Sequence, residues 1–100
     1  MDKITVGIIC KDAEDTIEKT LRSVKWVDEI IVVDNESTDR TVSIVRNYTN
    51  RLFNSDSDSF SEKRNLILKK LETDWVFFVD ADEVVTSELQ DEIAIISHLS

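Results

Sequence analysis

The sequence has 100 residues, a length that fits one domain with a single core. Its net charge of −9 argues against nucleic acid as a partner and against charge-driven binding to anionic lipid, because an acidic surface repels phosphates. The single cysteine excludes an internal disulfide, and a chain with one glycine and no proline cannot form a glycine-rich phosphate loop.

Four apolar runs predict strands at Ile4–Cys10, Glu29–Asp34, Arg51–Asn54 and Trp75–Asp80. They are rich in β-branched and aromatic residues and alternate little, as expected for strands covered on both faces. The segments between and after them carry apolar residues at helical spacing, which predicts helices there. The predicted stripes are Ala13, Ile17, Leu21 and Val24; Thr41, Val45 and Tyr48; Phe60, Ile67 and Leu71; and Leu89, Ile93 and Ile96.

This alternation predicts an α/β fold in which a four-stranded, mostly parallel sheet of order 3-2-1-4 carries helices on both faces. Asp12 and Thr38 are predicted to cap the first two helices, and Ser87 with Gln90 matches a capping box for the last. No apolar run approaches the roughly 20 residues that span a bilayer, and the first residues lack the pattern of a secretory signal. We therefore expect a cytoplasmic location and no transmembrane segment.

Acidic residues gather where the predicted strands end, which is where open parallel sheets bind ligands. Asp34 ends the second strand, and Asp80 and Asp82 follow the fourth. Neighbouring carboxylates repel one another unless a cation neutralises them. Their oxygens suit Mg²⁺ or Mn²⁺, which take one or two carboxylates together with substrate phosphates. The acidic pair thus predicts metal-assisted handling of a diphosphate, and the alternative is that these acids only cap a turn.

Arg64 lies four residues after Phe60 and three before Ile67, within an apolar helical stripe. A charge on a stripe that faces the core is costly unless it reaches a partner or water. Two interpretations stay open. Arg64 either extends to the sheet edge and meets an anionic ligand or Asp80, or it runs along the helix flank to solvent.

Taken together, these residues resemble glycosyltransferase family 2, which has the GT-A fold, and within it the bacterial lipopolysaccharide-core glucosyltransferase type. The resemblance runs from about Ile4 to Ile96 and rests on four segments in family order: ITVGIICKDAEDTIEKTLRSV, WVDEIIVVDNESTDRTV, EKRN and DWVFFVDADEVVTSEL. It implies that residues 1–100 form the nucleotide-sugar-binding domain of an inverting hexosyltransferase. The implied donor is a nucleotide-diphosphate sugar, most commonly a UDP-sugar in this family.

The resemblance also implies roles at the base end of the donor site. Asp34 matches the acid that recognises the nucleotide base, and the backbone of Ile9, Cys10 and Lys11 matches the segment that lines the base. Glu36 stands where the family usually has a glycine, so we expect the backbone of this turn to differ from the family pattern.

Further roles follow for the rest of the donor site. Ser37 and Asp39 match a motif that shapes the base pocket, and Arg64 matches a basic residue near the base and phosphates. Asp80 and Asp82 match the DXD motif. Its first acid faces the ribose and the metal, and its second acid ligates the metal, which is Mg²⁺ or Mn²⁺.

Members of the family carry a further acceptor-binding half after the DXD motif, and that half holds the acidic general base. This sequence ends one predicted helix beyond Asp82, so we assign no catalytic residue. We expect a piece of a longer enzyme; the alternatives are a natural truncation or a partner that supplies the rest. The resemblance implies a glycan or lipid-linked acceptor of the cell envelope, bound through the C-terminal half. It also implies that the full-length enzyme lies peripherally on the inner face of the membrane.

The alternative function is a non-catalytic nucleotide-binding module of the same fold. Two other acidic α/β classes fit poorly. A receiver-like signalling domain needs an acidic pair directly after the first strand, where Cys10 and Lys11 stand. A sugar nucleotidyltransferase needs a glycine-rich loop at the same place.

Overall fold

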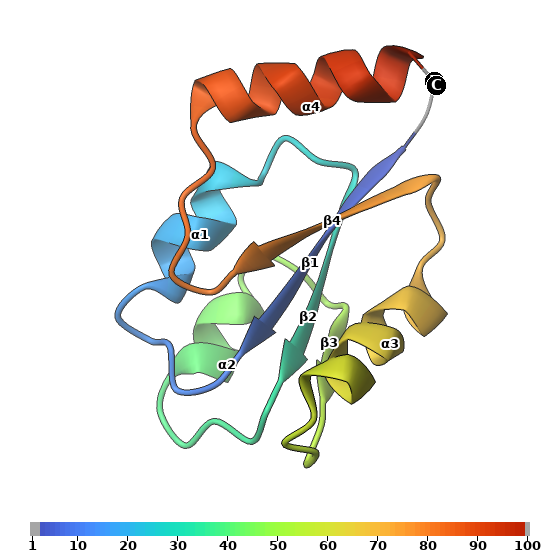
Figure 1. The fold of residues 1–100 in the computed structure, drawn as a ribbon. Coiled ribbons are helices and arrows are strands. Elements are labelled where there is room, and N and C mark those ends of the chain that lie inside the picture. The colour runs from blue at the N-terminus through green and yellow to red at the C-terminus, as the bar shows by residue number, and fades with distance from the viewer. Residues whose placement is uncertain (1–2, 100) are drawn as a thin grey trace.

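The computed structural model describes residues 3–99, with side chains up to Ile93. Its four strands form one parallel sheet of order β3-β2-β1-β4, so the predicted fold class and strand order are confirmed (Figure 1). The elements are β1 (Ile4–Cys10), α1 (Ile17–Ser23), β2 (Glu29–Asp34), α2 (Thr41–Val45), β3 (Leu52–Asn54), α3 (Phe60–Lys70), β4 (Trp75–Asp80) and α4 (Ser87–Leu99). Only β3 differs from the predicted strands, because it begins one residue later.

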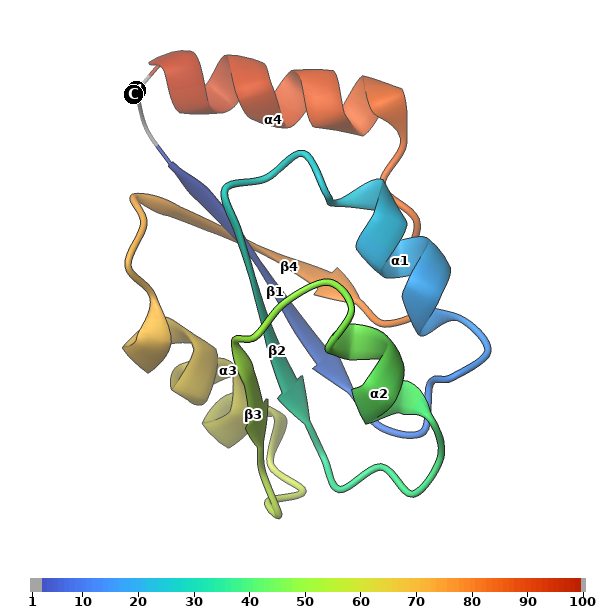
Figure 2. The same cartoon turned by 180° about the vertical axis from the view of Figure 1, so that it is seen from behind.

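Helices α1 and α2 cover one face of the sheet and α3 covers the other (Figures 1 and 2). The alternation of side chains along a strand produces two apolar layers. Val6 and Ile8 pack in the layer that contains Leu21 of α1. Ile31 packs with Ile67 of α3 in the other layer. Both layers bury the strands, which explains why the sequence shows apolar runs without alternation.

Helix α4 follows β4 and runs past the start of β1 (Figure 1). Val85, just before this helix, packs with Val79 of β4 in the layer that contains α1, and Ile93 of α4 is buried. Within residues 3–99, no helix has both the length and the apolar character needed to cross a membrane.

The predicted helix caps are wrong. Helix α1 begins after Thr16 and α2 after Arg40, and neither residue makes a side-chain capping bond. Asp12 and Thr38 bond to each other instead, because the Thr38 amide donates to the Asp12 carboxylate over 2.7 Å and ties two loops together. At α4, Thr86 rather than Ser87 supplies the cap, since its Oγ1 accepts a backbone N–H of the first turn.

The only glycine of the sequence lies where α3 approaches β1 most closely. A Cβ atom added at Gly7 would lie 2.9 Å from Cγ2 of Ile67 and 3.2 Å from two ring carbons of Phe78. Contacts this short force a neighbour to move. The missing side chain at Gly7 therefore leaves room for Ile67 of α3 to pack against β1.

We predict that Gly7→Ala lowers the free energy of unfolding by about 1–3 kcal/mol, because an added methyl overpacks this contact. Urea denaturation followed by tryptophan fluorescence measures the change. Ser61→Ala, on the exposed side of α3, is the control and should be nearly neutral. Ile67→Leu removes the Cγ2 methyl, so it should lower the free energy of unfolding by less in the Gly7→Ala background than in the wild type. Additive costs would contradict this account.

Candidate functional site

The strand register gathers the predicted site residues at one edge of the sheet. Cys10 of β1 pairs with Asp34 of β2, and Asp34 pairs with Asn54 of β3. On the other side of β1, Ile9 pairs with Asp80 of β4. Because all four strands are parallel, their carboxyl ends form a single rim, as the sequence predicted.

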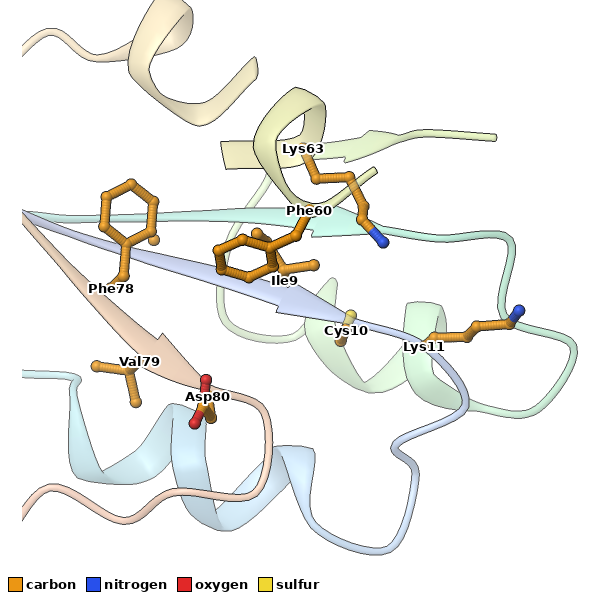
Figure 3. A pocket seen from close by; sticks show the side chains of 9 residues that line it. Ile9, Cys10, Lys11, Phe60, Lys63, Phe78, Val79 and Asp80 are labelled. Atoms are coloured by element: carbon orange, nitrogen blue, oxygen red, sulfur yellow. The ribbon is translucent and has the colours of Figure 1, made fainter. Parts of the chain in front are cut away.

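A hollow of about 250 Å³ opens at this rim (Figure 3). The predicted residues Ile9, Cys10, Lys11 and Asp80 line it. Helix α3 and strand β4 add side chains that the sequence analysis did not assign to the site. The full lining is Gly7, Ile9, Cys10, Lys11, Phe60, Lys63, Phe78, Val79 and Asp80.

Asp34 lies beneath the rim with 3% of its surface exposed, and its carboxylate is held on both oxygens. Ser37 donates its backbone N–H over 2.9 Å and its hydroxyl, and the Cys10 thiol donates over 3.4 Å. Burial raises the pKa of the Cys10 thiol, and the Asp34 charge raises it further, so the thiol keeps its proton. A carboxylate has about four acceptor positions, and these bonds occupy three on Asp34. Asp34 does not line the hollow, so its predicted contact with the nucleotide base stays a prediction.

Lys63 is the cation of the hollow that sequence reasoning missed. Its side chain is only 8% exposed and projects from α3 (Figure 3). Lys63 lies three residues after Phe60 and four before Ile67, so it shares the stripe on which Arg64 was singled out. Helical spacing is compatible with either Lys63 or Arg64 facing the hollow, and only the packing of α3 shows which of them does.

Arg64 lies at the margin of the hollow. Its side chain is exposed, and its guanidinium carbon stands 4.9 Å from the centre of the Phe78 ring, as in a cation–π contact. Phe78 itself lines the hollow. Among the side chains described, Arg64 makes no ion pair with Asp80. Its predicted contact with base and phosphates stays a prediction.

The acidic turn after β4 is fastened to α1. The carbonyl of Ala81 accepts hydrogen bonds from the hydroxyls of Thr16 and Thr20, each over 3.0 Å. Within the turn, the Glu83 amide donates to the Asp80 carbonyl over 3.0 Å, and the Glu83 carboxylate accepts from the Asp80 amide. These bonds fix the backbone on both sides of Asp82, whose side chain is exposed.

The donor set of this turn fits a divalent cation that arrives with a ligand. Among the described residues, no three His, Cys, Asp or Glu side chains are arranged to hold a metal ion by themselves. Asp80 and Asp82 are exposed carboxylates two residues apart, however, and Mg²⁺ and Mn²⁺ commonly take one or two such groups plus substrate phosphates and water. These two residues would hold the metal.

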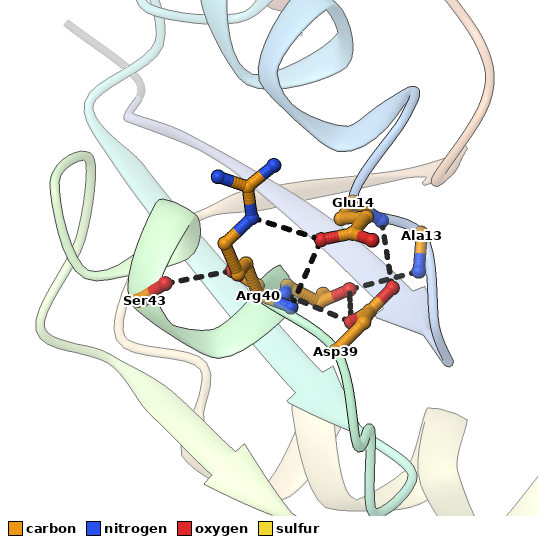
Figure 4. A network of polar contacts seen from close by, with 6 residues as sticks. Ala13, Glu14, Asp39, Arg40 and Ser43 are labelled. Atoms are coloured by element: carbon orange, nitrogen blue, oxygen red, sulfur yellow. Dashed lines mark hydrogen bonds and ion pairs between the residues drawn. The ribbon is translucent and has the colours of Figure 1, made fainter.

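Asp39 joins the loop after β1 to the start of α2 (Figure 4). Its carboxylate accepts from the Thr41 amide over 2.9 Å, from the Thr41 hydroxyl, and from the Glu14 amide over 3.2 Å. Arg40 forms an ion pair with Glu14 across the same gap, at 3.1 Å. Neither Asp39 nor Ser37 lines the hollow, so their predicted role in donor binding stays a prediction.

The turn after β2 keeps a glycine-like backbone despite its sequence. Glu36 has a φ angle of 53°, in the left-handed region that glycine enters without strain. The position where the family usually has glycine thus retains the conformation that favours glycine. The Asn54 side chain accepts from the Glu36 amide over 3.2 Å and helps to hold this conformation.

The Asp39 network predicts a specific loss of stability in acid. Hydrogen bonds from Thr41 lower the pKa of Asp39. Because the pKa of Asp39 is lower in the folded than in the unfolded state, its ionised carboxylate stabilises the fold at a pH above the unfolded-state pKa, near 4. This stabilisation is lost as the pH falls through the folded-state pKa. Asp39→Asn removes this titration, so wild-type stability should fall more steeply than that of the variant below about pH 4. Urea midpoints from pH 7 to 2 measure the slopes.

Asp58→Asn alters an exposed loop acid and is the matched control, which should follow the wild-type slope. Parallel slopes for wild type and Asp39→Asn would remove Asp39 from the acid response.

Residues 5–96 match the sequence model of glycosyl transferase family 2. A relative named as an uncharacterized glycosyltransferase of Rickettsia typhi is 40% identical over 94 residues, which cover 93% of this chain and 32% of the relative. The SPbeta prophage-derived glycosyltransferase SunS of Bacillus subtilis is 37% identical over 95 residues. The chain thus spans about a third or less of the length of these relatives.

Solved structures with the same architecture belong to larger proteins. S. aureus TarS in complex with UDP-GlcNAc superposes with a TM-score of 0.78 at 34% identity, over 96% of this chain and 31% of TarS. Glucosyl-3-phosphoglycerate synthase from Mycobacterium tuberculosis, in complex with Mg²⁺ and UDP, gives 0.73 at 26% identity, over 83% of this chain and 34% of the synthase. With the family match covering nearly the whole sequence, the chain belongs to glycosyl transferase family 2.

Proposed function

We propose that this chain binds the nucleotide-sugar donor, a UDP-sugar, of a metal-dependent inverting hexosyltransferase. The observation that carries the proposal is the placement of the acidic turn, Asp80 and Asp82, beside a hollow at the carboxyl rim of the sheet. The inverting course and a cell-envelope glycan as acceptor rest on the resemblance of the sequence to the lipopolysaccharide-core type.

The rim offers two ends of different chemistry. Strands β2 and β4 flank β1, and a strand spacing of about 4.8 Å puts their ends about 10 Å apart. The acidic turn lies at the β4 end. Apolar side chains, including Phe60 and Phe78, line the hollow beside this turn. We place the diphosphate at the β4 end and the nucleotide base toward β2.

Charge explains why a metal belongs in this proposal. A diphosphate adds negative charge to Asp80 and Asp82 in a chain of net charge −9. A divalent cation held by Asp80 and Asp82 would neutralise the carboxylates and would supply Lewis-acid assistance to the departure of the nucleoside diphosphate. The chain's own contribution is positional, because Thr16 and Thr20 hold the turn in place before any ligand arrives.

The similar structures support this choice of ligand. TarS has been solved with UDP and with UDP-GlcNAc. Glucosyl-3-phosphoglycerate synthase has been solved with UDP and Mg²⁺, and with Mn²⁺, UDP and glucosyl-3-phosphoglycerate. We extend the uridine nucleotide and the divalent cation to this chain.

We predict that Mn²⁺ raises the affinity for UDP by about tenfold or more over the affinity in a chelator, because the cation removes the repulsion at the acidic turn. Asp82→Asn should abolish most of this difference, since a neutral amide is a weaker metal ligand of nearly the same shape. Isothermal titration calorimetry with UDP, in Mn²⁺ and in EDTA, measures both effects.

Asp91→Asn, an exposed acid on α4, gives the same charge change away from the rim and should behave as wild type. Equal UDP affinity of the wild-type chain in Mn²⁺ and in EDTA would refute the metal assignment.

We also propose that the remaining acceptor position of Asp34 receives the imide N–H of uracil. Asp34→Ala should weaken UDP binding by about tenfold to a hundredfold, because a buried donor left unpaired costs about 1–3 kcal/mol. The variant also loses the bonds that Ser37 donates. Ser37→Ala, titrated beside it, measures the share of the hydroxyl bond, because the backbone N–H of residue 37 remains. Unchanged UDP affinity in Asp34→Ala would remove Asp34 from the site.

A further inference from the structure

Lys63 brings an ammonium group to the hollow on a side chain that is largely buried. The side chain leaves α3, is 8% exposed and lines the hollow together with Asp80 (Figure 3). Among the side chains described, no carboxylate forms an ion pair with it. A buried cation without a counter-charge is costly, so its remaining donors favour an acceptor in the hollow.

The chain holds this ammonium group in place through Asn35, which is 7% exposed and directly follows β2. The Asn35 backbone N–H donates to the Cys10 carbonyl over 2.9 Å. In the amide orientation that satisfies its neighbours, the Asn35 side-chain nitrogen donates to the Ser55 carbonyl over 2.9 Å. Its oxygen then accepts from the Lys63 Nζ over 3.2 Å. This bond uses one of the three donors of the ammonium group.

The position of Asn35 shows which part of a donor nucleotide Lys63 would meet. Asn35 follows β2, whereas Asp80 ends β4, two strands away. With the diphosphate at the acidic turn, the group nearest Lys63 is the edge of the base farthest from the ribose. In a pyrimidine nucleotide that edge carries the substituent on C4, because C4 lies opposite the glycosidic nitrogen in the ring.

We propose that Lys63 is a specificity-determining residue that donates a hydrogen bond to the C4 carbonyl of the donor's pyrimidine base. This inference rests on the proposed nucleotide-sugar function. Uracil and thymine carry a carbonyl at C4 and accept this bond. Cytosine carries an amino group there, so two donors would face each other in a closed space. Lys63 thereby selects uridine and thymidine nucleotides against cytidine nucleotides.

Phe60 provides a comparison that separates selection among bases from overall affinity for nucleotides. Its side chain is 58% exposed although it lines the hollow, so its ring is available for stacking on a base. Stacking on an aromatic ring tolerates every base, because each base presents a π-face. Phe60 should strengthen the binding of all nucleotides alike, whereas Lys63 should distinguish among them.

Calorimetric titrations of UDP, dTDP and CDP in Mn²⁺ test the proposal. Wild type should bind UDP and dTDP about tenfold to a hundredfold more tightly than CDP, as a site built to hydrogen-bond one group rejects an analogue without it. Lys63→Met keeps the length and apolar stem of the side chain but removes its donors. It should weaken UDP and dTDP and leave CDP nearly unchanged, so that the UDP-to-CDP affinity ratio falls. The preference for UDP that remains is the share of Asp34, because cytosine carries no N3–H for that carboxylate to accept.

Lys63→Gln is the second variant. Its amide can both donate and accept a hydrogen bond, so it should also reduce the UDP-to-CDP ratio. Circular dichroism confirms that each variant is folded. Lys69→Met, on the exposed side of the same helix, should keep the wild-type ratio, and Phe60→Ala should weaken all three nucleotides by a similar factor.

The outcomes separate this inference from the proposed function. If Lys63→Met weakens UDP, CDP and inorganic pyrophosphate equally, Lys63 contacts phosphate and the inference is overturned. If UDP binds in Mn²⁺ but Lys63→Met keeps the wild-type UDP-to-CDP ratio, the inference fails and the proposed function stands. If wild type binds no nucleotide, the proposed function fails, and the inference that rests on it fails as well.

Discussion

The candidate site depends on the pairing of β1 with a parallel strand on each side. This register sets Cys10 against Asp34 and Ile9 against Asp80, so that residues 24 to 71 positions apart in sequence share one edge. Antiparallel pairing on either side would carry one of the two acids to the opposite edge. The strand ends remain joined beyond the ladder, because the Asn35 amide donates to the Cys10 carbonyl and the Ser55 amide to the Asp34 carbonyl. The loops after the strands are therefore positioned by the sheet itself.

A second constraint acts through α3. The absence of a side chain at Gly7 lets this helix lie against β1, and this close approach carries Phe60 and Lys63 to the edge of the hollow. Asn35, which directly follows β2, accepts a hydrogen bond from the Lys63 amine. The glycine that the sequence analysis noted only for its rarity thus sets one wall of the site. The acidic turn is held from the other face of the sheet, where the hydroxyls of Thr16 and Thr20 donate to the carbonyl of Ala81.

The sequence predicted the elements whose signals are local and repeated. Runs of β-branched and aromatic residues located the strands closely, and their alternation with helical stripes predicted the sheet order, because right-handed crossovers leave few topologies. It did not single out Lys63, because several residues satisfy the same helical spacing. Lys63 and Arg64 both lie on the α3 stripe, and packing buries the first and exposes the second. It also failed at the caps, because Asp12 bonds to a loop that is distant in sequence instead of its own helix. Such long-range bonds leave no periodic signal.

The site divides its polar groups by charge. At the β4 end lie two exposed carboxylates, Asp80 and Asp82, which need a cation before they can face a diphosphate. At the β2 end Lys63 is buried, with a neutral amide from Asn35 as its partner. A carboxylate at position 35 would pair with the ammonium more strongly and draw it away from a ligand, whereas an amide holds its direction and leaves donors free. In the proposed function, the β4 end takes a cation from outside the chain, and the β2 end supplies one from within it. A ligand that is anionic at one end and rich in carbonyl acceptors at the other satisfies both ends at once.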